Sequence, residues 1–242
     1  MVQVQAAVLA RAWLDGGPVT VEHVCRACVQ MVAVDGVRLS LASPLTVSEP
    51  VTVTGRTGAR LAELQVTVGE GPGITALEEG RPVLVPDLDA ETAVRRWPLF
   101  VPAAVEAGVG ALFAFPLQVG AITMGVLELC RARPGGLTGR QFQDALLFAE
   151  VVRERVLNGE VSDEVTDQTT GGSGDCAGFL ARWPEVHQAS GMISVQLGVG
   201  LAEAFVRLRA HAFAQDRGLR LVARDVVDRV LRFTPEELIG GP

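Results

Sequence analysis

Residues 158–178, "NGEVSDEVTDQTTGGSGDCAG", are the stretch that most constrains how this chain can fold. They contain five acidic residues and no Arg, and their only large apolar side chains are two valines. Such a segment buries too little apolar surface to offset the entropy lost when it becomes ordered. It therefore predicts an acidic, flexible linker that divides the 242-residue chain into two parts.

The two parts differ in charge, although the whole chain has a net charge of −7. Residues 1–158 carry 13 Arg and 16 acidic residues, whereas residues 179–233 carry eight Arg and five acidic residues. The negative net charge argues that the chain as a whole is not a cationic nucleic-acid binder. The basic C-terminal part keeps nucleic-acid binding open for that part alone.

The N-terminal part predicts an α+β fold with a central antiparallel sheet and helices packed outside it. Helical spacing and caps indicate helices at 2–14, after Thr20 and after Thr138, and alternation or β-branching indicates strands at 37–43 and 51–55. The other expected elements are helices at 57–68 and within 69–80, a strand at 83–88, a broken helix at 93–108 and a strand pair at 109–131.

One apolar stretch imitates a membrane span, because residues 107–127 contain no charged side chain. However, Pro116 and four glycines favour two strands joined by a turn at "QVGA". The N-terminus lacks signal-peptide features, and the four cysteines are unevenly spaced. We therefore expect a cytoplasmic protein with free thiols that does not span a membrane.

After the linker the apolar period is helical and predicts three helices, at about 185–197, 201–216 and 219–232, with "GVG" at 198–200 as a turn. In the first of them the core spacing falls on Val186, Ala189, Ser190, Ile193 and Leu197. The three helices are too small for a generous core. We expect them to pack against a partner chain or a long preceding helix.

Several motifs of the N-terminal part resemble a GAF domain, the small-molecule-sensing module of many bacterial regulators. They are "GEGPG" at 69–73, "GRPV" at 80–83, Asp87-Leu88, Pro116-Leu117 and "GVL" at 125–127. The resemblance implies a sensor of an unknown small molecule. Many relatives have a Cys where Gly73 stands, which argues against thiol chemistry at that turn.

Residues 186–228, "VHQASGMISVQLGVGLAEAFVRLRAHAFAQDRGLRLVARDVVD", resemble an ANTAR domain. This resemblance implies a homodimer that binds paired stem-loops in a nascent transcript and antiterminates transcription. Many relatives have a Lys where this chain has Ser190. The residues that the resemblance and the basic character of these helices nominate for RNA contact are Gln188, Ser190, Gly191, Arg207, Arg209, Arg217, Arg220 and Arg224.

Charge alone gives only partial support for RNA binding. Arg217, Arg220 and Arg224 share one helical face and could contact phosphates or stack on loop bases. Asp residues interleave with them, so a solvated helix surface with paired charges is the simpler alternative. Two other functions stay open: a degenerate ANTAR unit that only makes protein contacts, and DNA binding.

No constellation of residues indicates an enzyme, a cofactor or a metal site. Cys25 and Cys28 have metal-like spacing, but a zinc site needs two more ligands and the only histidines are His23, His187 and His211. Residues i and i+3 of a helix share one face, so packed helix thiols are expected. "GEGPG" and "GVG" lack the Lys-Ser/Thr of a phosphate loop. The candidates for a ligand cavity beside the sheet are Trp97, Phe100, Phe113 and Phe115.

Together these inferences predict a sensor domain with an N-terminal helix at 1–157, a linker at 158–178, an all-α RNA-binding unit at 179–233 and a tail at 234–242. The predicted function is a dimeric transcription regulator in which the first unit senses a signal and the second binds RNA.

Overall fold

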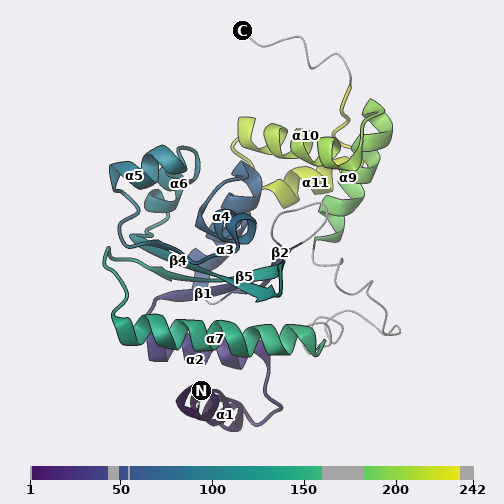
Figure 1. The fold of residues 1–242 in the computed structure, drawn as a ribbon. Helices are drawn as coiled ribbons and strands as arrows, with labels where there is room; N and C mark the ends of the chain where they lie inside the picture. The colour runs from purple at the N-terminus through teal and green to yellow at the C-terminus, as the bar shows by residue number, and fades with distance from the viewer. Residues whose placement is uncertain (1, 43–48, 54, 160–182, 235–242) are drawn as a thin grey trace.

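The computed structural model describes residues 2–42, 49–53, 55–159 and 183–234. The described residues form a sheet with helices on both faces, followed by three further helices (Figure 1). Apart from Asn158 and Gly159, the linker predicted at 158–178 lies outside the described residues, and so does the tail after Thr234.

Five antiparallel strands form one sheet in the order β2-β1-β5-β4-β3. The strands are β1 (Gly36–Leu41), β2 (Glu49–Val53), β3 (Val83–Val85), β4 (Ala111–Val119) and β5 (Ile122–Arg131). The apolar stretch 107–127 forms β4 and part of β5, which pair as a hairpin. Gly120 takes a φ of +59° in the turn, a left-handed conformation that favours glycine. The predicted antiparallel sheet is therefore confirmed, and the apolar stretch is a strand pair.

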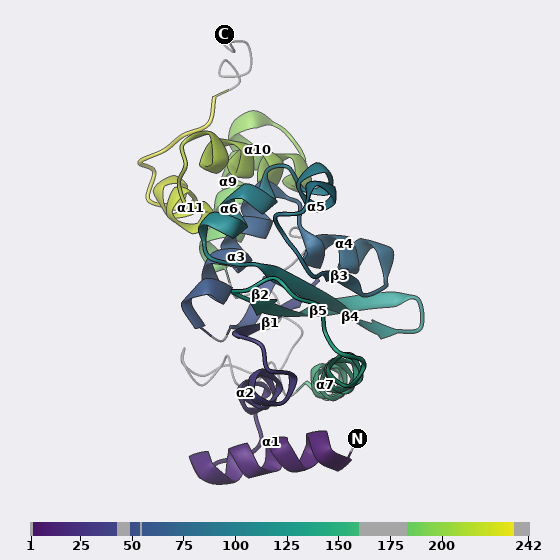
Figure 2. The same ribbon diagram turned by 90° about the vertical axis from the view of Figure 1, so that its left-hand side faces the viewer.

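Helices α1 (Val2–Asp15), α2 (Val21–Val32) and α7 (Gly139–Leu157) lie on one side of the sheet, with α1 outermost (Figure 2). The hydroxyl oxygens of Thr20 and Thr138 accept hydrogen bonds from the backbone N–H groups of His23 and Gln141, as the predicted caps require. Apolar side chains of α2, α7 and the facing strands form the lower core. Its members include Cys25, Cys28, Leu39, Phe113, Phe115, Leu127 and Phe148.

Four helices cover the opposite face of the sheet: α3 (Gly55–Val68), α4 (Pro72–Glu79), α5 (Glu91–Arg96) and α6 (Phe100–Glu106). Their upper core includes Leu61, Leu77, Val83, Trp97, Phe100, Leu112 and Cys130. The "GEGPG" turn joins α3 to α4, and the carboxylate of Glu70 accepts hydrogen bonds from the N–H groups of Leu99 and Phe100, at 2.5 and 2.9 Å. This turn thus holds the start of α6.

The C-terminal helices are α9 (Pro184–Leu197), α10 (Leu201–Ala214) and α11 (Leu219–Val227). Gly198 has a φ of +68° in the predicted "GVG" turn. Two helices end earlier than predicted, because Asp216 and Arg229 take left-handed φ values of +49° and +61° beyond α10 and α11. The three helices share a core of their own, which includes Trp183, Val186, Ile193, Phe205, Leu208, Leu219 and Val226.

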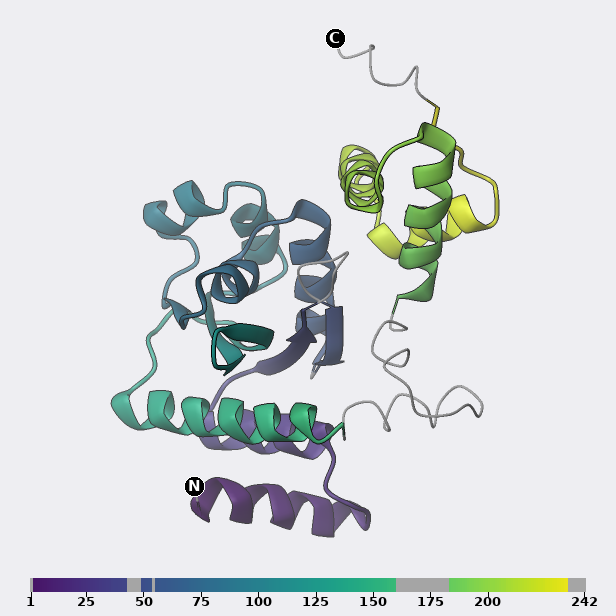
Figure 3. The same ribbon diagram turned by 45° about the vertical axis from the view of Figure 1, so that its right-hand side comes forward.

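The C-terminal helices also touch the sheet-containing part, and α10 packs against α3 (Figure 3). Val66 of α3 is only 4% exposed and belongs to the core of the C-terminal helices. A preceding helix of the same chain therefore supplies packing that the three short helices lack.

Candidate functional site

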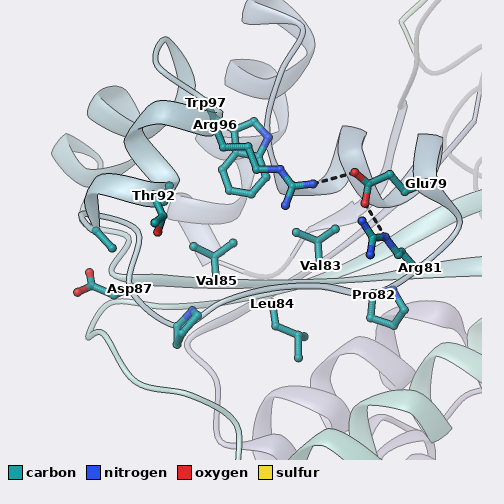
Figure 4. A pocket seen from close by; sticks show the side chains of 13 residues that line it. Glu79, Arg81, Pro82, Val83, Leu84, Val85, Asp87, Thr92, Arg96 and Trp97 are labelled. Atoms are coloured by element: carbon teal, nitrogen blue, oxygen red, sulfur yellow. Dashed lines mark hydrogen bonds and ion pairs between the residues drawn. The ribbon is translucent and has the colours of Figure 1, made fainter.

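A groove of about 320 Å³ opens beside β3, the edge strand of the sheet (Figure 4). Val83 and Val85 of β3 point toward α5 and Trp97, whereas Leu84 points to the other side. The Trp97 Nε1–H donates a hydrogen bond to Oγ1 of Thr75 at 3.0 Å, which fixes the indole ring. The groove thus combines an apolar floor with an aromatic wall, as small-molecule sites commonly do.

Three charged side chains stand at one end of this groove. The carboxylate of Glu79 accepts hydrogen bonds from Nε of Arg81 and Nη2 of Arg96, each at 2.8 Å. The hydrogen bond from Arg81, together with the charges of both arginines, lowers the pKa of Glu79 below its ordinary value. The guanidinium of Arg96 also lies 4.8 Å from the centre of the Trp97 ring. Because exposed ion pairs are weak, a ligand carboxylate or phosphate could share these guanidiniums.

A buried ion pair crosses the middle of the sheet. Arg38 of β1 stands opposite Glu128 of β5, and each residue is no more than 4% exposed. Gln65 of α3 donates from Nε2 to Oε1 of Glu128 at 2.7 Å and accepts from the N–H of Gly73 at 2.9 Å. Burial lowers the pKa of Arg38 to about 9, so the guanidinium keeps its charge at neutral pH. The pair and Gln65 therefore join the sheet to α3 and α4.

Gly73 leaves the space that Glu128 occupies. A Cβ at position 73 would lie 2.5 Å from the carboxyl carbon of Glu128. Any side chain at this position would push the buried carboxylate away from Gln65. The Cys that many GAF relatives carry here would therefore not fit beside Glu128.

Polar side chains of α9 and α11 lie together on the C-terminal helices. Nε of Arg220 lies 2.7 Å from Oε1 of Glu185, and Arg224 is close enough to act on the same carboxylate. Partial burial opposes the ionisation of Glu185, but a backbone hydrogen bond and the two arginines lower its pKa overall. Gln188 is exposed one turn further along α9. Glu185 thus brings Arg220 and Arg224 together, and the spacing of three residues puts the exposed Gln188 on the same face of α9 as Glu185.

The sheet-containing part also matches a known family in sequence. A family model described as the GAF domain matches residues 18–152, more than half of the chain. The chain belongs to the GAF domain family. A GAF domain is a sensor and dimerisation module of signalling proteins. The matched residues end within α7, so α9, α10 and α11 lie beyond the matched span.

Several solved GAF domain structures are similar to this chain at low sequence identity. The GAF domain of an Acinetobacter phosphoenolpyruvate-protein phosphotransferase is 9% identical, with a TM-score of 0.49 over 65% of this chain and 94% of that one. Its counterpart from Coxiella burnetii is 11% identical, with a TM-score of 0.48 over 66% and 96%. The GAF-B domain of DevS from Mycobacterium smegmatis is 17% identical, with a TM-score of 0.41 over 57% and 93%. A comparison with curated proteins found no match.

The four aromatic residues predicted to line one ligand cavity in the GAF domain do not lie together. Trp97 and Phe100 belong to the upper core, and of the two only Trp97 lines the groove beside β3. Phe113 and Phe115 belong to the lower core, on the other face of the sheet. They are two residues apart on β4, and such residues point to the same face of a strand. The four residues therefore do not line one cavity, and all four are buried core side chains.

The candidate RNA-contacting residues beyond the GAF domain also separate into groups. Arg217 is exposed and pairs with Asp225 at 2.7 Å, and Arg207 pairs with Glu203 at 2.8 Å. Arg209 instead points at the GAF domain and donates to the carbonyl oxygen of Thr67 at 3.1 Å. Gly191 is partly exposed, and no heavy atom from elsewhere in the described structure lies within 4 Å of its missing Cβ.

Ser190 corrects the predicted contact set, because its side chain is not on the surface. It is 0% exposed, and its hydroxyl donates to the carbonyl oxygen of Val186 at 2.8 Å within α9. Ser190 is therefore a core residue of α9, as its helical spacing predicted, and its side chain is not placed to contact RNA.

Neither a metal-binding group nor a helix that could span a membrane is found among the described residues. They contain no cluster of three or more His, Cys, Asp or Glu side chains suited to a metal ion. Cys25 and Cys28 are buried in α2, and burial raises the pKa of Cys28 well above its ordinary value. Within the same residues no single helix is long and apolar enough to cross a membrane. Only the bent pair of α9 and α10, at 105°, passes by length and composition.

Proposed function

We propose that this chain is a cytoplasmic, signal-responsive transcription regulator that acts as a homodimer. In this proposal the GAF domain senses a signal, and the C-terminal helices bind stem-loop RNA in a nascent transcript and antiterminate transcription. The observation that carries it is the surface shared by Gln188, Arg220 and Arg224 on helices with their own core. The ANTAR-like sequence of the same helices supports the assignment to RNA.

The ion pairs of this surface do not oppose RNA binding. The side chains of Arg217 and Asp225 are 39% and 30% exposed, so water screens their pair, and such a pair contributes at most about 1 kcal/mol. A phosphate can therefore replace Asp225 at low cost. Arg220 is 48% exposed but its partner Glu185 only 13%, so a phosphate would bind the outer N–H groups of Arg220 while Glu185 keeps its contact with Nε. A guanidinium can also stack on an unpaired loop base.

A gel-shift titration with a two-hairpin leader RNA tests this proposal. We expect Arg220→Ala/Arg224→Ala to weaken binding about tenfold or more at low salt and to reduce the slope of log affinity against log salt by about two. The matched control is Arg95→Ala/Arg133→Ala, which removes the same charge from exposed positions of the GAF domain. Equal affinity for the two double variants would remove Arg220 and Arg224 from the site.

The groove beside β3 is our candidate for the sensory site of the GAF domain. Its charged end, formed by Arg81, Glu79 and Arg96, suits a small molecule with a carboxylate or phosphate and an apolar body. Such a ligand would lie against the indole of Trp97.

A second candidate function is a GAF protein that acts through protein contacts alone. The carboxylate partners of Arg207, Arg217 and Arg220 favour it, because each guanidinium already has a neighbour of opposite charge. Competition between hairpin RNA and duplex DNA separates RNA binding from DNA binding. Failure of the full-length protein to bind either nucleic acid would favour the protein-contact function.

A further inference from the structure

Neighbouring residues of helix α3 contact two different parts of the protein, the sheet and the C-terminal helices. Gln65 faces the sheet, where it bonds to Glu128 and to the N–H of Gly73. Val66 is buried in the core of the C-terminal helices, and the carbonyl oxygen of Thr67 accepts a hydrogen bond from Arg209 of α10. One helix therefore carries contacts to the buried ion pair of the GAF domain and to the C-terminal helices.

Arg209 is held on the GAF side of α10. Its Nε–H donates to Thr67, and its guanidinium lies 5.6 Å from the centre of the Phe205 ring. Burial lowers its pKa from the ordinary value, as expected for a cation taken out of water. While docked, this side chain directs its Nε–H at the GAF domain and not at another molecule.

Two glycines let the surfaces approach closely. Gly69, directly after α3, takes a φ of +75°, and a Cβ there would collide with the guanidinium of Arg209. Gly218 precedes α11, and a Cβ there would lie 2.5 Å from Oε1 of Glu63 on α3. At Gly69 the backbone of the GAF domain therefore lies directly against a charged group of α10. At Gly218 the backbone before α11 lies against a charged group of α3.

We propose that this contact is an autoinhibitory docking surface, in which Val66, Thr67 and Gly69 hold α10 and Arg209, and Glu63 holds the start of α11, in a closed state. Undocking frees Arg209 and the docked face of α10. Because Gln65 ties α3 to Glu128, a ligand that displaces α3 or α4 in the GAF domain would weaken docking. The RNA part of this inference rests on the proposed function, whereas the docking part does not.

A closed state should raise the apparent dissociation constant for RNA by a measurable factor. If only a fraction of molecules is undocked, the apparent dissociation constant for RNA is the intrinsic one divided by that fraction. Weakening the contact from the α3 side should therefore tighten RNA binding, although no RNA-contacting residue is changed. A merely structural contact would not produce this gain.

Val66→Ser is the test variant, since this side chain belongs to the C-terminal core and not to the core of the GAF domain. Val206→Ser is the matched control on α10, where the valine is 54% exposed. Hydrogen exchange followed by mass spectrometry on the full chain reports docking. Exchange within β5 and α7 reports the fold of the GAF domain. If Val66→Ser also raises exchange within β5 and α7, Val66→Ala replaces it as the test variant.

We expect Val66→Ser to raise exchange in residues 61–68 and 201–214 and to tighten binding of the two-hairpin RNA by about fivefold. Val206→Ser should change neither. Unchanged exchange in both segments would overturn the docking surface. Raised exchange with unchanged RNA affinity would overturn autoinhibition but leave RNA binding intact. Raised exchange with no RNA binding by any variant would instead overturn the proposed function, and autoinhibition with it.

Discussion

The buried pair of Arg38 and Glu128 places two charges inside a sheet where water is excluded. Taking ions out of water is costly, and their mutual attraction offsets that cost only when hydrogen bonds complete the arrangement. Gln65 supplies one of these bonds from α3. The pair thus fixes the position of a helix as well as the register of two strands.

Loss of one partner should be far more harmful than loss of both. Glu128→Gln leaves the Arg38 charge buried without its counter-ion, and we expect it to lower the free energy of unfolding by about 3 kcal/mol. Arg38→Met/Glu128→Leu removes both charges and should recover most of that loss. Urea unfolding followed by circular dichroism measures both variants. A double variant no more stable than the single one would contradict this account.

The sequence led to two different predictions for the location of Ser190, and the structure distinguishes between them. Apolar spacing placed it with Val186 and Ile193 on the inner face of α9, whereas the ANTAR resemblance nominated it for RNA. Its burial follows the spacing, which reports the packing of this chain's own side chains. A role inferred from relatives depends on a Lys that this chain lacks at this position.

At the scale of helices and strands, local signals predicted most of the fold. The caps at Thr20 and Thr138, the turn at Gly120 and the periodicity of the strands each depend on neighbours in sequence. The groove beside β3 and the contact between α3 and α10 could not be predicted in this way. Thr67 and Arg209, for example, are 142 residues apart, and no local pattern encodes their meeting.

Helix α9 contains a glycine that the described structure does not require. A Cβ at Gly191 would meet no heavy atom from elsewhere within 4 Å, so Gly191→Ala should stabilise the C-terminal helices by about 1 kcal/mol. Gly198→Ala is the matched control and should destabilise them, because its φ is +68°. Thermal unfolding of both variants measures the effect. If Gly191→Ala stabilises the helices but weakens RNA binding or dimerisation, another molecule approaches this glycine closely.

At the scale of the whole molecule, α1 has two apolar faces. Val4, Val8 and Ala12 are buried, whereas Leu9 and Trp13 are 59% and 82% exposed and lie one turn apart. A large apolar face that a helix turns to solvent commonly marks an interaction surface. This face is our candidate for part of the interface in the proposed homodimer.

Leu9→Ser/Trp13→Ser should therefore convert a dimer into a monomer. Size-exclusion chromatography with light scattering measures the mass. Leu84→Ser, which changes an exposed leucine on the edge strand β3, is the control and should leave the mass unchanged. A double variant that remains dimeric would place the interface elsewhere.

The alternating contacts of α3 also limit how this chain can change in length. One inserted residue rotates the rest of an α-helix by about 100°. An insertion or deletion in α3 before Gln65 would therefore turn Gln65 away from the sheet and Val66 away from the C-terminal helices in a single step. A substitution can alter one of the two contacts and leave the other in place. A change in the length of this helix alters both. Homologues that share both contacts should accordingly vary in length before α3 or after Gly73 and keep a constant spacing from Gln65 to Gly73.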